Sequence, residues 1–194
     1  MSKQAFDLMR VRIYVSGTVN HDGSVGGFSA YMISETDGFQ HRRTLSGYGM
    51  NTTATRMQLK AIETALLSIK AKYDKKREKD PSAPVVKPII EIHTNNPQVS
   101  VGLNRNIHQW NKTDWKTRKG EPLKHADLWQ NIYFLIEHYV LSHKVVLQKG
   151  KASEELLSTI KQSLFMADNT AKHSMNQKIE IHEESFIGAV PLKS

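Results

Sequence analysis

The residues best suited to ligand chemistry lie in one basic, aromatic stretch, residues 104–131. Its three tryptophans are interleaved with six lysines and arginines. Cationic side chains displace counterions from a phosphate backbone, and indole rings give rigid apolar contact with sugars. A nucleic-acid surface is therefore one interpretation, and a solvated surface helix with one or two buried tryptophans is the other. The first assigns contacts to Trp110, Lys112, Trp115, Lys116 and Lys119.

A second set of polar residues lies at places where an α/β fold builds sites. Ser16 and Asn95 end two predicted strands, while Gln58 and Asp168 each lie on the apolar face of a predicted helix. Polar side chains beyond the carboxyl ends of strands tend to gather at one edge of the sheet. We therefore expect these four to converge, although a hydrogen-bonded amide at the rim of the core would also explain Gln58.

The start of the helix that carries Gln58 is a third candidate. Thr52, Thr53 and Arg56 lie at its positive end, where a phosphate could bind. Simple capping of the helix by a threonine is the alternative.

The elements that must position these residues follow from periodicity and turn residues. Three strands, 8–15, 28–33 and 42–48, form an antiparallel meander, and a helix is predicted from 53 to 70. A strand at 89–94 and a helix after Pro97 follow, with a helical break around 111–113. A helix at 128–141, a strand at 144–147 and a helix at 154–175 complete the order. This order, βββ-α-β-α-α-α-β-α, indicates an α/β fold.

The composition narrows the class of protein. The 194 residues are 39% hydrophobic and 24% charged, which is typical of one globular domain. A net charge of +8 and a pI near 9.6 favour an anionic partner, with nucleic acid ahead of a membrane surface. The absence of cysteine excludes disulfides and thiolate metal sites. Without an apolar signal-peptide region, we expect a cytoplasmic protein.

Several local motifs resemble those of type 1 ribonuclease H. They are IYVSGT, ATRMQLKAIETAL, IEIHTNNPQV, IHQWNKTDWKT with KHADLWQ, and ADNTAK. The order of elements is similar too, and the resemblance covers residues 9–175. Residues 104–125 resemble the basic handle with which such enzymes grip an RNA–DNA hybrid.

The resemblance also implies a site that this chain lacks in part. The family cuts the RNA strand with two magnesium ions held by four carboxylates, which fall on Ser16, Gln58, Asn95 and Asp168. Only Asp168 is acidic, and the family's loop histidine falls at or near Lys151. Two adjacent magnesium ions need several anionic oxygens, so one carboxylate cannot hold the pair.

Three acidic residues are candidates for a relocated site, namely Asp22, Glu63 and Glu91. Glu63 is five residues from Gln58 and points from another helix face. Glu91 lies below the end of its strand, and Asp22 lies in a loop. None is expected to replace the missing ligands. We expect a neutral polar cluster instead, in which Gln58 and Asn95 donate hydrogen bonds to Asp168.

The sequence therefore predicts a ribonuclease H-like, five-stranded mixed sheet flanked by helices, with a basic handle at about 104–125. The domain is expected over 1–178, with a charged, proline-containing linker at 70–88 and a tail at 179–194. The expected function is binding of an RNA–DNA hybrid or duplex RNA without cleavage, with no cofactor, no membrane and a protein partner unknown. The alternatives are a residual ribonuclease that uses magnesium and a protein-interaction scaffold.

Overall fold

A six-stranded mixed sheet forms the centre of the computed structural model, which describes residues 9–36, 38–82, 86–148, 154–177 and 181–191. The strands lie in the order β5-β4-β1-β2-β3-β6. Antiparallel pairs join β1 to β2, β2 to β3 and β3 to β6, while β4 runs parallel to both β1 and β5. Their bounds are β1 (Arg10–Val19), β2 (Val25–Thr36), β3 (Phe39–Met50), β4 (Ile89–Thr94), β5 (Ser142–Leu147) and β6 (Ile181–Pro191).

The five predicted strands are confirmed, and β6 extends the sheet. It lies within the stretch expected to be a tail and pairs with β3 over much of its length. The domain limits themselves stay a prediction.

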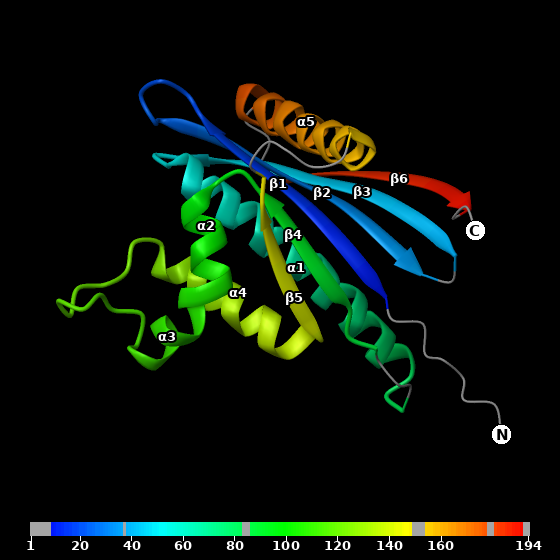
Figure 1. Ribbon diagram of the computed structural model, residues 1–194, viewed down its shortest axis with the longest axis horizontal. Coiled ribbons are helices and arrows are strands. Elements are labelled where there is room, and N and C mark those ends of the chain that lie inside the picture. Colours follow the sequence, from blue (N-terminus) through cyan, green and yellow to red (C-terminus); the bar gives the residue numbers. More distant parts are fainter. Residues whose placement is uncertain (1–8, 37, 83–85, 149–153, 178–180, 192–194) are drawn as a thin grey trace.

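Helices cover both faces of the sheet (Figure 1). The helix α5 (Glu154–Gln177) lies on one face, while α1 (Ala54–Lys79) and α4 (Ala126–Tyr139) lie on the other. Three short helical segments precede α4: α2 (Pro97–Val101), the π-helix η1 (Gly102–Asn106) and α3 (Ile107–Lys112). The charged run expected to begin a linker at 70 continues α1 as far as Lys79, so only the residues after it connect to β4.

Alternation along the strands divides the core in two. In β1, Val11, Ile13 and Val15 are buried with residues of α1 and α4. Tyr14 points to the other face, where it packs with Tyr31 and the α5 side chains. This follows from the two-residue period of a strand, which sends successive side chains to opposite faces.

A glycine lets α5 approach the sheet closely. A Cβ at Gly27 would stand 2.0 Å from the carbonyl oxygen of Ala171, far inside contact distance. A side chain in this place would push α5 off β2. The close approach brings Asp168, one turn before Ala171, to the sheet.

The handle, residues 104–125, begins in η1, includes α3 and continues as a loop to the start of α4, and this loop projects away from the sheet (Figure 1). Two backbone hydrogen bonds close its loop, from Thr117 to Glu121 at 2.8 Å and from Leu123 to Trp115 at 2.9 Å. Within the described residues, no helix is long and apolar enough to cross a membrane.

Candidate functional site

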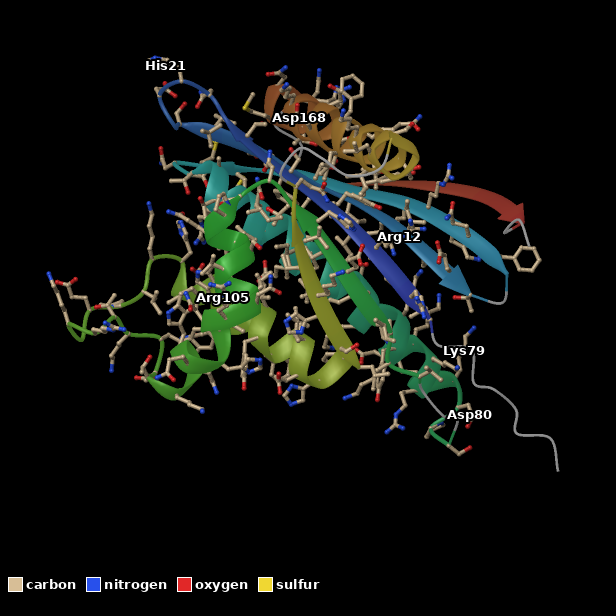
Figure 2. The ribbon with its side chains drawn as sticks, viewed as in Figure 1. Arg12, His21, Lys79, Asp80, Arg105 and Asp168 are labelled. Carbon is tan, nitrogen blue, oxygen red and sulfur yellow. The ribbon has the colours of Figure 1, made fainter. Side chains whose placement is uncertain are left out.

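Ser16 and Asp168 meet where β1 passes beneath α5, and Figure 2 labels Asp168 there. Ser16 Oγ donates to Asp168 Oδ1 at 3.2 Å. The other carboxylate oxygen, Oδ2, lies 2.7 Å from the ammonium of Lys172, one turn further along α5. Both oxygens of Asp168 therefore have partners. We call Ser16, Asp168 and Lys172 the β1–α5 cluster.

Gln58 and Asn95 form a separate pair. Gln58, only 4% exposed, donates from Nε2 to Asn95 Oδ1 at 2.7 Å and accepts from Thr94 Oγ1 at 2.5 Å. The expectation that these two amides donate to Asp168 was therefore wrong about the partners. The four positions lie as two polar pairs, and Lys172 was missed. Its spacing of four residues from Asp168 on a helix was the signal that could have revealed it.

The side chains at these positions do not fit a pair of magnesium ions. Magnesium takes oxygen ligands, and two ions close together need several negative charges. The four positions offer one carboxylate, a hydroxyl and two amides, and the carboxylate is already paired with an ammonium. No group of three or more His, Cys, Asp or Glu side chains suited to a metal occurs among the described residues.

The acidic residues considered as replacements are engaged elsewhere. Glu63 is buried and binds Lys60 at 2.6 Å and Asn131 of α4 at 2.8 Å. Glu91 lies 2.6 Å from His93. Asp22 is in the exposed loop after β1, where the hydrogen bond from the Ser24 backbone lowers its pKa.

The first turn of α1 uses its threonines for structure. Thr53 is the N-cap and accepts from Arg56 N at 3.2 Å. Thr52 is buried, so its side chain does not face an open surface. The guanidinium of Arg56 binds both oxygens of Asp127 at 2.9 and 2.6 Å, and this pairing raises the Arg56 pKa and lowers the Asp127 pKa.

A groove of about 520 Å³ lies between this turn, α2 and the handle. His125, which the sequence reasoning missed, lies in it just before α4 and approaches Thr53 Oγ1 at 3.4 Å. Burial, followed by the cations of Arg56 and Lys124, lowers the His125 pKa. The residues that line the groove include Thr53, Gln98, Trp110, Lys124, His125 and Trp129.

The handle tryptophans differ in their exposure. Trp115, expected among polar surface residues, is 7% exposed and packs its ring 5.8 Å from that of Tyr133. A backbone turn with positive φ at Asp114 and Trp115 sends the indole back into the core. Trp110 is half-buried in the groove wall, 5.1 Å from the buried ring of Trp129. Trp110 thus remains the candidate for nucleic-acid contact, and Trp115 does not.

The handle lysines are exposed, as a phosphate contact requires. Lys112 and Lys119 have no ion pair within the part of the chain that the structure describes, whereas Lys116 lies 2.9 Å from Asp114. Lys151, the position matched to the family's loop histidine, falls outside the described residues.

Comparison with known proteins gives consistent matches. The RNase H family model matches residues 9–176. The chain is 29% identical over 147 residues to a ribonuclease H of Orientia tsutsugamushi, covering 75% of this chain and 76% of that protein. It is 32% identical over 124 residues to a ribonuclease H of Treponema denticola, covering 64% of this chain and 76% of that protein.

Solved structures share the fold. The crystal structure of LC9-RNase H1 superposes with a TM-score of 0.60 at 18% identity, covering 98% of this chain and 80% of that one. The structure of LC11-RNase H1 in complex with an RNA/DNA hybrid superposes with a TM-score of 0.52 at 14% identity, covering 86% of this chain and 97% of that one.

Proposed function

The chain belongs to the ribonuclease H family, and from that premise we propose that it binds an RNA–DNA hybrid or duplex RNA without cleaving it. The observation that carries the proposal is the pairing of Asp168, the one acidic residue among the four ligand positions, with Lys172. A carboxylate that already holds an ammonium at 2.7 Å is poorly placed to hold two divalent ions as well.

Binding is supported by a second surface, formed by the handle and the groove next to it. The exposed handle lysines lie on a loop that projects from the domain, and Trp110 and Lys124 line the adjoining groove. A positive loop next to a groove with an aromatic wall suits a phosphate backbone and its sugars. LC11-RNase H1, which shares the fold, has been crystallised with an RNA/DNA hybrid.

A residual ribonuclease remains the second candidate, because the relatives are named ribonuclease H. In that case the missing ligands would have to come from the substrate or from residues outside the described part. Cleavage would then be slow and would depend on Asp168.

The test is a paired binding and cleavage assay on matched hybrid, duplex RNA and duplex DNA, with magnesium or manganese. We expect salt-sensitive binding and no cleavage by wild type. Cleavage that Asp168→Asn abolishes would establish the ribonuclease instead, and Glu78→Gln, at an exposed acidic residue near the end of α1, is the matched surface control. If wild type shows neither binding nor cleavage, the protein-interaction scaffold is left as the function.

A further inference from the structure

The β1–α5 cluster carries no net charge, because one ammonium offsets one carboxylate. Asp168 contributes −1 and Lys172 contributes +1, while Ser16 is neutral. Four carboxylates at the same place would repel a phosphate until metal ions neutralised them. In this chain a phosphate meets no such repulsion.

Lys172 also has unused hydrogen-bonding capacity. An ammonium has three N–H donors and no acceptor, and the contact with Asp168 Oδ2 occupies one of them. The side chain is 57% exposed, whereas that of Asp168 is 37% exposed. Asp168 therefore holds the ammonium from its less exposed side, and the remaining N–H donors of Lys172 face solvent.

The cluster and the groove lie on opposite faces of the sheet, because Ser16 faces α5 while Gly17, the next residue of β1, faces α1. A Cβ on Gly17, the residue after Ser16, would stand 2.7 Å from both Ala54 O and Gln58 N of the first turn of α1. Thr53 at the start of that turn lines the groove. A duplex contacts both sites only where it crosses the end of the sheet, at which the first turn of α1 and Ser16 lie on either side of β1.

We propose that Lys172 is the cation of this site and binds a backbone phosphate directly, so that the protein grips a duplex without a divalent metal. The inference rests on the proposed function, since it assumes that the chain binds nucleic acid. It adds the residue that contacts the phosphate and the independence from magnesium. The other explanation of Lys172 is a surface ion pair that only steadies α5.

The two explanations predict different effects of Asp168→Asn and Lys172→Gln on binding affinity. Asp168→Asn frees the ammonium and removes a negative charge that repels phosphate, so it should tighten hybrid binding several-fold in EDTA. Lys172→Gln should weaken binding and reduce the slope of log affinity against log salt by about 0.9. A purely structural pair predicts that both variants lower the melting temperature and that neither changes affinity in this way.

The experiment measures hybrid binding at several salt concentrations, in EDTA and in magnesium, for wild type, both single variants and the double variant. Lys161→Gln is the matched control, because Lys161 is exposed on the same helix about 16 Å away. Melting temperatures verify that each variant is folded. We expect wild-type affinity in EDTA to equal or exceed that in magnesium, and Lys161→Gln to keep the wild-type slope.

Three results would overturn the inference. In the first, wild type binds the hybrid but gains affinity on addition of magnesium. In the second, Lys172→Gln binds like Lys161→Gln, and in the third, Asp168→Asn weakens binding. The proposed function fails separately, when wild type binds no duplex under any condition, and the inference falls with it.

Discussion

At the scale of single residues, neighbouring side chains in the handle have different roles. Trp115 is 7% exposed and belongs to the main core, whereas Lys119, four residues later, is exposed. The aromatic and basic residues of this stretch therefore have different roles. The buried Trp115 fixes the loop to the core, and the exposed Lys119 is available to a ligand.

Trp115→Ala should lower the free energy of unfolding by about 3–5 kcal/mol, because it removes a buried indole and leaves a cavity. Urea unfolding followed by circular dichroism measures this. Lys119→Ala is the control and should change stability by less than about 0.5 kcal/mol. A Trp115→Ala protein as stable as wild type would show that the indole is not part of the core.

His93 is a buried titratable residue of β4, two positions before Asn95. It is 3% exposed and stacks on Tyr14 with ring centroids 4.4 Å apart. The Gln148 amide nitrogen lies 2.6 Å from Nδ1, and Glu91 Oε1 lies 2.6 Å from Nε2. Donation by Gln148 requires an unprotonated Nδ1, which fits a neutral ring. Burial lowers the His93 pKa despite the opposing charge of Glu91.

A lowered folded pKa gives stability a definite pH dependence. Below the unfolded pKa of about 6.5 the unfolded chain takes up the proton first, so stability is complete above that pH and falls as the pH falls toward the folded pKa. The slope should reach at most about 1.4 kcal/mol per pH unit. His125, whose pKa is also lowered, adds in the same direction.

We expect His93→Gln to flatten this dependence between pH 7.5 and 5.5 in urea unfolding. His108→Gln, on an exposed position of α3, is the control and should keep the wild-type slope. If His93→Gln left the pH dependence unchanged, the ring would not be held neutral by its surroundings.

At the scale of elements, the handle is a loop whose base is fixed by packing. Gly102 of η1 leaves room for the Trp129 ring, since a Cβ there would stand 2.5 Å from it. Trp110 of α3 packs on the same ring. The lysines at the tip take no part in this packing, so they can be changed without loss of the fold.

Replacing Lys112, Lys116 and Lys119 together by alanine should flatten the salt dependence of hybrid binding. Each lost phosphate contact reduces the slope of log affinity against log salt by about 0.9. Lys116 already binds Asp114, so we expect a change nearer two contacts than three. Binding titrations at several salt concentrations measure the slope.

The matched control removes three cations from the far end of α1, where Figure 2 labels Lys79. Lys75, Arg77 and Lys79 are all exposed there, and their replacement by alanine changes the net charge equally. If both triple variants lose the same slope, net charge alone drives binding and the handle is not the contact surface.

Elements with a clear period were predictable from the sequence, and those defined by distant contacts were not. The strand at 89–94 has the predicted bounds, because it is a short apolar run between prolines and a turn. The pairing of β6 with β3 depends on residues more than a hundred positions apart, for which no local pattern exists. Trp115 was misplaced because a left-handed turn, which has no hydrophobic period, directs its ring.

At the scale of the whole molecule, the fold and the site chemistry are separable. The RNase H family model matches residues 9–176, while three of the four residues that we expect at the family's metal-ligand positions, Ser16, Gln58, Asn95 and Asp168, carry neutral side chains. A fold supports several functions because the scaffold depends on packing and the chemistry depends on a few side chains. Restoring those side chains is therefore a test of the entire scaffold.

The triple substitution Ser16→Asp, Gln58→Glu and Asn95→Asp would return four carboxylates to the site. In EDTA we expect a lower melting temperature than wild type, because like charges gather there and position 58 is only 4% exposed. Magnesium should recover the melting temperature in a concentration-dependent way, because an ion that binds only the folded state stabilises it. Wild type should show no such response.

Adding Asp168→Asn to the triple variant is the control, and it should abolish the response to magnesium. Cleavage of a hybrid by the triple variant is expected to be weak, since a missing general acid or base typically costs about 10²–10⁴-fold in rate, and the resemblance places the family's histidine at or near Lys151. A triple variant that folds in EDTA but whose melting temperature ignores magnesium would mean that the four positions do not converge as the family's do. The separation of the Ser16–Asp168 and Gln58–Asn95 pairs would then be a property of the backbone, beyond the reach of side-chain changes alone.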